Sequence, residues 1–238
     1  MSLAFLTPDS AGDDVIARSP TERLARAAGA RMQVREGWNV AIAYGDGAAE
    51  RTLLAERAVF IDRSNLLKLE LQAHAPVLAK IVAAASGGHA LEPGRAVRSG
   101  GGEAWWCPVS PTRVLVLGEP EHGARIRTSV ADAADAVLGT VTVSDLTCGL
   151  TALALAGPGA RELLARFCAI DVRPAVMPVG AFRPGSVART PGYVLRDGAE
   201  RLLVLVGWAL GHYLWTVVAD AAEYLGGGPG GADVLIAP

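Results

Sequence analysis

The sequence predicts an α+β fold with antiparallel sheets, in which one strand–strand–helix–hairpin–helix unit occurs twice. Two observations carry this prediction. Segments that alternate apolar and polar residues, typical of strands, are interleaved with segments of helical periodicity in the same order in both halves. In addition, Asp62 and Asp145 stand at matching places, 83 positions apart, each at the end of a predicted strand. A repeat of this length indicates a duplicated α+β unit rather than a solenoid.

Composition narrows the class of protein. The 238 residues are 51% hydrophobic, with a mean hydropathy of +0.31, which excludes a disordered tail or a coiled coil. A net charge of −2 gives no reason to expect a nucleic-acid or anionic-membrane partner. The N-terminal residues are acidic and lack the pattern of a signal peptide. Three cysteines without CxxC spacing indicate buried thiols in a reducing compartment, so we expect a cytoplasmic protein: Cys107, Cys148 and Cys168.

One apolar run, Leu202–Ala219, approaches the length of a membrane span. Gly207, Gly211 and His212 interrupt it, and the part before Gly207 is rich in strand-forming residues. We therefore expect a buried strand followed by a helix that faces the core, and no membrane partner.

The elements expected before the first matched aspartate begin with a helix, which Ser19 and Pro20 start and Gly29 ends. The elements that follow are strands over 31–36 and 40–44, a helix over 48–57 and a strand over 59–62.

The rest of the first half contains the clearest strand, NLLKLELQA, with Leu67, Leu69 and Leu71 on one face. A helix from Pro76 to Ala85 follows. The stretches AWWC and RVLVLG then form a hairpin, and a helix covers about 123–138.

The second half repeats this order. Its expected elements are a strand over 141–145, the strand TALALA, the helix ARELLARFC, a hairpin of 193–196 with 202–206 that turns at Asp197-Gly198, and a helix over 212–225. The pseudo-repeats thus cover about 59–138 and 141–225 of one domain, 19–226.

A flexible N-terminus (1–18) is expected to precede this domain, and a loose Gly-rich tail (227–238) to follow it. The VLIA segment of the tail can dock on an edge. We expect a ligand cleft where the halves meet.

Chemistry-bearing residues are sparse. The four histidines are not spaced as metal ligands, so we expect no metal. Asp62 and Asp145, with the hydroxyl residues beside them, are expected to satisfy backbone N–H groups in turns. Trp105 and Trp106 are adjacent on a predicted strand, so one ring should enter the core and the other should line a surface or cavity. That second ring would suit a pterin or flavin edge, or simply pack.

Several segments resemble a known family. AAGARM…GWNVAIAY…AAERTLLAERAVFIDRS is similar to the N-terminal region of the glycine-cleavage T-protein (aminomethyltransferase) family. The stretch from WCPVSPTRVLVLG through VSDLTCGLTALALAGPGARELLARFCAIDV to GHYLWTVVADAAEYLG resembles the gamma subunit of heterotetrameric sarcosine oxidase. The resemblance covers roughly residues 19–226. It implies the T-protein fold without its C-terminal barrel.

The resemblance also implies tetrahydrofolate as a cofactor, bound in a central channel. The segment from Arg189 to Glu200 matches the family's folate-contacting hairpin at Arg189, Tyr193 and the Asp-Gly pair. However, Arg196 stands where the family has a pterin-binding Glu, and a cation does not accept the pterin's N–H donors. The expected cofactor-binding residues are Tyr193, Arg196, Arg189, Trp105 and Trp106.

The catalytic aspartate of the family lies in a Gly-Gly-(x)2-Asp-Asp segment. The matching stretch here is GGEAWW, in which Glu103 is the only acid. The catalytic residue is therefore unknown, with Glu103 and Glu200 as candidates.

Three functions follow from the resemblance. The first is a non-catalytic, gamma-like subunit whose flavin-dependent amine oxidase partners carry the cofactors. The second is a free-standing tetrahydrofolate-dependent one-carbon transferase in which Glu103 and Glu200 take acid roles. The third is a T-protein fold recruited to another, anionic ligand, with Arg189 and Arg196 as charge partners.

Overall fold

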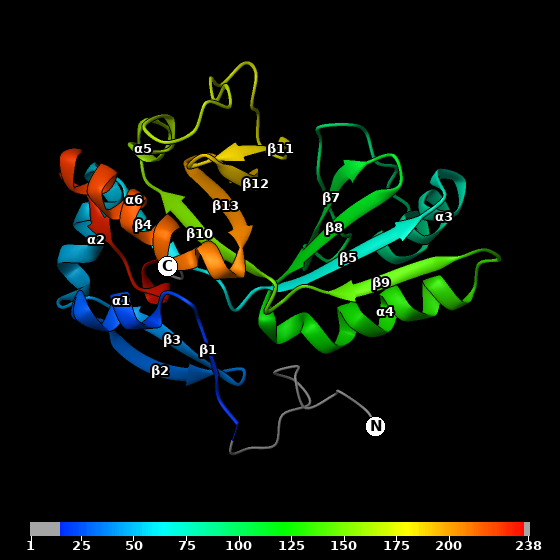
Figure 1. Cartoon of the computed structure of the whole chain (residues 1–238), viewed down its shortest axis with the longest axis horizontal. Coiled ribbons are helices and arrows are strands. Elements are labelled where there is room, and N and C mark those ends of the chain that lie inside the picture. Colours follow the sequence, from blue (N-terminus) through cyan, green and yellow to red (C-terminus); the bar gives the residue numbers. More distant parts are fainter. Residues whose placement is uncertain (1–14, 236–238) are drawn as a thin grey trace.

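The chain folds into three sheets and six α-helices over residues 15–235, which the computed structural model describes (Figure 1). The helices are α1 (Glu22–Ala27), α2 (Gly47–Glu56), α3 (Ala75–Ser86), α4 (Gly123–Asp135), α5 (Ala160–Ala165) and α6 (Gly211–Tyr224). The strands of the six-stranded sheet, in order across it, are β11 (Phe182–Val187), β12 (Thr190–Gly198), β13 (Arg201–Gly207), β10 (Leu150–Ala156), β4 (Val59–Asp62) and β14 (Gly228–Pro229). The five-stranded sheet has the order β6 (Val97–Arg98), β7 (Ala104–Ser110), β8 (Arg113–Gly118), β5 (Leu67–Ala73) and β9 (Val141–Asp145). A small sheet has the order β1 (Ala17–Arg18), β3 (Trp38–Ala43) and β2 (Arg31–Arg35). This architecture confirms the predicted α+β class with largely antiparallel sheets.

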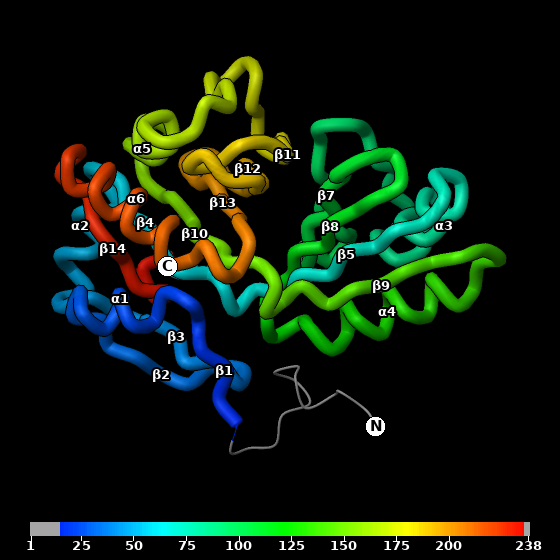
Figure 2. Tube along the Cα trace, in the orientation of Figure 1, coloured from blue at the N-terminus to red at the C-terminus, as the bar shows by residue number. Residues whose placement is uncertain are grey.

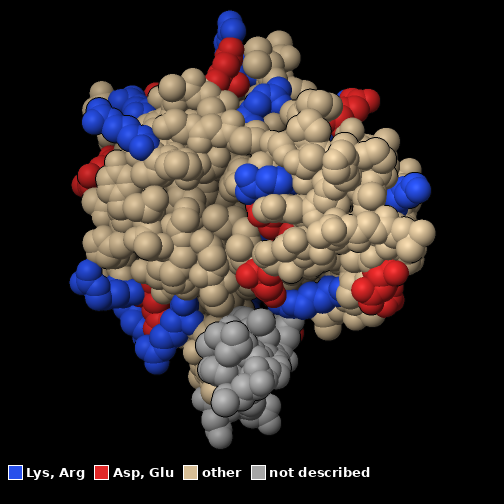
Figure 3. Space-filling view, turned by 45° about the vertical axis from the view of Figure 1, so that its right-hand side comes forward, with Lys and Arg blue, Asp and Glu red and all other residues tan. Residues whose placement is uncertain are grey.

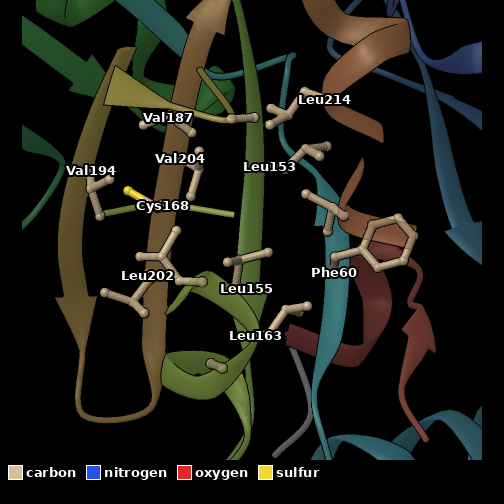
Figure 4. Close-up of a cluster of buried hydrophobic side chains, with 14 of the residues drawn as sticks. Phe60, Leu153, Leu155, Leu163, Cys168, Val187, Val194, Leu202, Val204 and Leu214 are labelled. Atoms are coloured by element: carbon tan, nitrogen blue, oxygen red, sulfur yellow. The ribbon is translucent and has the colours of Figure 1, made fainter. Parts of the chain in front are cut away.

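The outer face of the six-stranded sheet packs against α5 and α6. On β10, Leu153 and Leu155 point toward these helices, as Leu202 and Val204 do on β13 (Figure 4). Leu163 of α5 closes the same cluster. The alternation that predicted these strands therefore fills one face of the sheet with branched side chains.

The outer face of the five-stranded sheet packs against α3 and α4. Val114 and Val116 of β8 face these helices, and their neighbours Leu115 and Leu117 face the other large sheet. The central strands of each large sheet are thus buried on both faces, and the four layers run helix, sheet, sheet, helix.

The two halves cross at the centre through a pair of matching turns. Asp62 Oδ1 accepts a hydrogen bond from the backbone N–H of Ser64 at 2.9 Å, and Asp145 Oδ1 accepts one from Thr147 at 2.8 Å. These bonds confirm the predicted role of the two aspartates, which is to satisfy backbone N–H groups where a strand ends.

The hydroxyls of these turns then bond to the opposite half. Ser64 Oγ accepts from the N–H of Ala152, and Thr147 Oγ1 accepts from the N–H of Lys68, both at 3.2 Å. Lys68 and Ala152 therefore occupy equivalent places in the duplicated unit. This reciprocal exchange makes the duplication a single interlocked structure.

Lys68 breaks the symmetry of the centre. Its side chain is fully buried, and Nζ donates to the carbonyl oxygens of Ser64 (2.7 Å), Leu66 (3.0 Å) and Thr147 (3.1 Å). Burial lowers the pKa of Lys68 from 10.5 to about 7, although Asp62 opposes this shift. The hydrogen bonds to the three carbonyl oxygens replace those that the ammonium group would make to water if it were exposed.

The chain ends differ from the predicted boundaries. Of the segment 1–18, which was predicted to be flexible, residues 1–14 lie outside the described range. Ala17–Arg18 form a strand that pairs in parallel with Trp38–Asn39. The predicted loose tail is ordered where it is described: β14 lies beside β4 and pairs with it in parallel (Figure 2). Val234 is buried. The VLIA segment was expected to dock on an edge; Val234 and Leu235 instead end a 3₁₀ helix (Ala232–Leu235), and the last two residues of the segment lie outside the described range. The bounds of the domain and of its pseudo-repeats stay predictions.

Two helices end earlier than predicted. The helix expected over 123–138 ends at Asp135, and ARELLARFC is helical only over Ala160–Ala165. The apolar run at Leu202–Ala219 divides, as predicted, between β13 and α6.

Replacing Lys68 by methionine should lower the free energy of unfolding by about 3 kcal/mol, because three buried carbonyl oxygens lose their donor. Urea denaturation at pH 7 measures this change. The only other lysine, Lys80, is exposed, so Lys80→Met is the matched control and should shift stability by less than about 0.5 kcal/mol. Equal effects of the two substitutions would contradict the role assigned to Lys68.

The same pair of proteins should show a pH dependence of known sign. Because the pKa of Lys68 is about 7 in the folded protein and near 10.5 when exposed, the unfolded chain binds more protons between these values. The stability of the wild type relative to Lys68→Met should therefore rise as pH increases from 7 toward 10. If the difference in stability between the wild type and Lys68→Met instead falls from pH 7 to pH 10, folding favours the ammonium form of Lys68, which would contradict this prediction.

Candidate functional site

An apolar layer fills the place where the two halves meet and where a ligand channel was expected. It contains Val59 and Ile61 of β4, Leu203 and Leu205 of β13, and side chains of β7 and β8 from the opposite sheet. Cys107, at its centre, is fully buried, and burial raises the pKa of its thiol. The contact between the sheets is therefore a packed core.

The two adjacent tryptophans divide as predicted. Trp106 is buried among the residues under α3 and α4, and no hydrogen-bond partner of its Nε1 is present in the described chain. Trp105 is half-buried against the layer between the sheets, and the guanidinium carbon of Arg98 lies 5.4 Å from its ring centroid. One face of the Trp105 ring thus lies near a cation from its own chain.

Of the predicted ligand residues on the segment from Arg189 to Glu200, Tyr193 and Arg196 lie on β12, the middle strand of the unit β11–β12–β13. Arg189 lies in the tight turn between β11 and β12, where Ala188 and Arg189 both have positive φ, 48° and 63°. This is the geometry of a two-residue hairpin turn of the primed type. Arg189 is exposed in that turn, and Tyr193 stacks on Phe182 with ring centroids 5.6 Å apart. The hairpin residues therefore contact each other.

Arg196 binds the backbone of its own hairpin and of a neighbouring loop. Its guanidinium donates to the carbonyl oxygens of Met177 (2.7 Å), Ala199 (2.7 Å) and Gly198 (3.3 Å). Burial, and to a lesser degree the nearby Arg161, lowers the pKa of Arg196. The cation that replaces the family's Glu is thus used to satisfy three carbonyls.

The turn of this hairpin lies two residues further on than predicted. Gly198 pairs with Arg201, so Ala199 and Glu200 form the loop, and Asp197 belongs to the strand. Asp197 forms an ion pair with Arg201 at 2.8 Å, and burial raises the pKa of its carboxyl. The Asp-Gly pair is a bulged part of the strand, which is why a turn signal misplaced it.

The two acidic candidates lie apart from each other in the fold. Glu103 precedes β7 and forms an ion pair with Arg125 of α4. Glu200 is exposed at the tip of the β12–β13 hairpin. Glu200 and Arg196 line a cavity of about 200 Å3 together with Arg161 and Arg201. Small-molecule sites usually exceed about 300 Å3.

These residues do not fit a bound folate. The central channel implied by the resemblance is occupied by apolar side chains, the guanidinium of Arg196 already binds carbonyl oxygens, and Arg98 lies over the ring of Trp105. Within residues 15–235, no group of three or more His, Cys, Asp or Glu side chains gathers as metal ligands do. His212 bonds to Arg23 at 2.8 Å, consistent with a structural role.

Sequence reasoning missed one exposed feature. A groove of about 630 Å3 lies between α4 and β9, the edge strand of the five-stranded sheet. Leu138 is 98% exposed, and its two sequence neighbours, Val137 and Gly139, line this groove. The signal that the sequence offered was the apolar spacing of Val137, Val141 and Val143 past the end of α4.

Among the helices of the described chain, none has both the length and the apolar character needed to cross a bilayer. A search of curated proteins finds no match.

The fold is similar to that of two solved proteins. Aminomethyltransferase T of the glycine cleavage system from Bartonella henselae superposes with a TM-score of 0.76 at 14% identity, over 92% of this chain. This chain spans 60% of that protein's length. A chain of heterotetrameric sarcosine oxidase from Corynebacterium sp. U-96, solved with pyrrole 2-carboxylate, superposes with a TM-score of 0.67 at 20% identity. The match covers 88% of this chain and 96% of that one.

These likenesses confirm the T-protein-like fold. A family model supplies the assignment by sequence. The model of the sarcosine oxidase gamma subunit family matches residues 72–223, more than half of the sequence. The chain belongs to the sarcosine oxidase gamma subunit family.

Proposed function

We propose that this chain is a non-catalytic subunit of a heteromeric, flavin-dependent amine oxidase, acting in the cytoplasm. One observation carries the proposal: the centre of the fold, where a folate channel was expected, is a packed apolar core. A chain with a closed centre contributes surface to an assembly. The family supplies the kind of assembly, since its name and one solved neighbour are those of a sarcosine oxidase.

The surface agrees with a docking role. Figure 3 shows a face with broad uncharged areas, on which charged side chains lie at the margin and in a small group near the middle. Large surfaces with few charged side chains are typical of subunit interfaces. All three cysteines are free, which supports a reducing compartment, but Cys148 is exposed and not buried as predicted.

A free-standing folate enzyme is less well supported. Of its proposed acids, Glu103 is neutralised by Arg125, and Glu200 is at an exposed hairpin tip. A site for another anion is less well supported, because the guanidinium of Arg196, one of its two proposed charge partners, already binds three carbonyl oxygens of this chain. Arg189, the other, lies exposed in the turn between β11 and β12.

The isolated chain should not bind tetrahydrofolate. Titration with the folate up to about 100-fold above a micromolar dissociation constant should leave the tryptophan emission unchanged after correction for absorbance. The same chain, tagged and purified from its native organism, should bring down other chains together with visible flavin absorbance. A saturable change in emission at micromolar folate, or purification without any partner, would contradict the proposal.

Arg196 should matter for stability and not for a ligand. Arg196→Met removes the donor to three carbonyls and should lower the free energy of unfolding by about 2 kcal/mol. Arg189→Met, on the same hairpin, removes an exposed side chain and should change stability by less than about 0.5 kcal/mol. Thermal and urea denaturation test both variants. An unchanged stability of Arg196→Met would overturn this assignment.

A further inference from the structure

The strand β9 leaves one of its edges open. It pairs with β5 along one side, and within residues 15–235 no strand pairs with the other side. Leu146 N donates to Lys68 O, so the alternation of an antiparallel ladder directs the backbone groups of Ser144 and Thr142 toward β5. The N–H and C=O groups of Val141 and Val143 therefore point outward, where an added strand would bond them.

The equivalent strand of the second half is not open. β4 corresponds to β9 through the match of Asp62 with Asp145, and its outer edge carries β14 in parallel. Gly228 N donates to Ala58 O at 3.3 Å, and Gly230 N donates to Phe60 O at 2.9 Å. The fold thus shows in its own second half what this edge accepts, which is an extended segment running parallel to the strand.

The space beside the two edges differs in size. In the second half, the rings of Phe60 and Trp215 are in edge-to-face contact at 4.9 Å. Trp215 is the fifth residue of α6, and Arg127 is the fifth residue of α4; both helices begin with glycine after a three-residue 3₁₀ turn. Val143 takes the place of Phe60. Because β9 and α4 carry no aromatic ring at these two positions, a groove is left between them in the first half, whereas the two rings fill the equivalent space in the second half.

The lining of this groove is largely apolar. Its apolar residues are Leu69, Ala131, Ala134, Val137, Val141 and Val143. At one end Arg127 forms an ion pair with Asp145 at 2.8 Å, so these two charges compensate each other. Val143 is 43% exposed in the absence of any cover. The chemistry favours a branched or aromatic side chain over a charged one.

We propose that an extended segment of a partner chain adds in parallel to the open edge of β9, pairs with Thr142 and Val143, and places a large apolar side chain in the groove between β9 and α4. The inference rests on the proposed function, since it specifies how the oxidase partner binds. β-strand addition supplies affinity through main-chain hydrogen bonds and specificity through the side-chain pocket.

The fit of β14 indicates what the partner segment is free to carry. A Cβ on Gly227 would lie 2.2 Å from Ala58 O, so the filled edge admits only glycine at this point. Within β14 itself, a Cβ on Gly228 would lie 3.8 Å from the nearest side-chain atom, so an added segment can carry a side chain there. The groove of about 630 Å3 beside β9 leaves room for a larger one.

The test is site-specific photo-crosslinking in the complex. Benzoylphenylalanine replaces Val143 in the chain, which is then co-expressed with the partner chains identified by native purification. The control carries the same group at Val34, which is similarly exposed on the strand β2 of the small sheet. We expect crosslinks from position 143 to one short segment of an oxidase chain, and at least a tenfold lower yield from position 34.

Hydrogen exchange provides the second measurement. The backbone amide of Val143 points outward, so its exchange in the wild-type complex should be at least tenfold slower than in the isolated chain. Val143→Pro removes this amide without a loss of bonding to β5, and should reduce recovery of the complex at least tenfold, whereas Val143→Ala should retain it.

The outcomes separate the inference from the proposed function. A complex that forms normally with Val143→Pro, or that shows no crosslink from position 143, contradicts the inference and leaves the proposed function intact. Crosslinks to residues 1–14 or to a second copy also overturn it, because they name a different occupant. If no oxidase chain purifies with the wild type, both proposals fail.

Discussion

The rest of the structure depends on the reciprocal hydrogen bonds at the centre of the duplicated unit. The hydroxyls of Ser64 and Thr147 each accept a backbone N–H of the opposite half, and the aspartates that precede them hold the turns that present those hydroxyls. Such buried bonds are costly to leave unmade, so the two halves cannot separate without exposing both. The crossing fixes the two large sheets face to face.

Face-to-face packing decides where function can reside. Each central strand buries both of its faces, and the layer between the sheets is built from side chains such as Ile61, Leu117 and Leu205. A ligand at that place would have to displace this core. The available chemistry is therefore at the strand edges and on the outer surfaces, which are the parts of a fold that meet other chains.

The sequence predicted the elements whose signals are local. The alternation of Leu67, Leu69 and Leu71 identified the clearest strand, and the matched aspartates identified the duplication. Other features depend on long-range packing and carried no local signal. Lys68 looked like one residue of a polar strand face, yet that face lies against the other half of the molecule. The turn at Ala188 and Arg189 uses positive φ without glycine, so no turn residue marked the hairpin β11–β12.

The site showed the same division. Resemblance placed Arg189, Tyr193 and Arg196 on one hairpin; Tyr193 and Arg196 lie on β12, whereas Arg189 lies in the turn before it. The partners of Tyr193 and Arg196 lie outside the predicted hairpin. Arg196 reaches Met177, and Tyr193 reaches Phe182, across strand pairings that periodicity does not reveal. The groove beside β9 was likewise invisible, because it arises from a comparison between two halves: a valine and an arginine stand where the other half has two aromatic rings.

The most direct test of the central claim is to separate this chain from its purified complex and measure which fraction holds the flavin and the folate. If the chain is a closed, non-catalytic subunit, both cofactors stay with the other chains and the isolated chain shows no visible absorbance. Flavin or folate that leaves stoichiometrically with this chain would contradict the account.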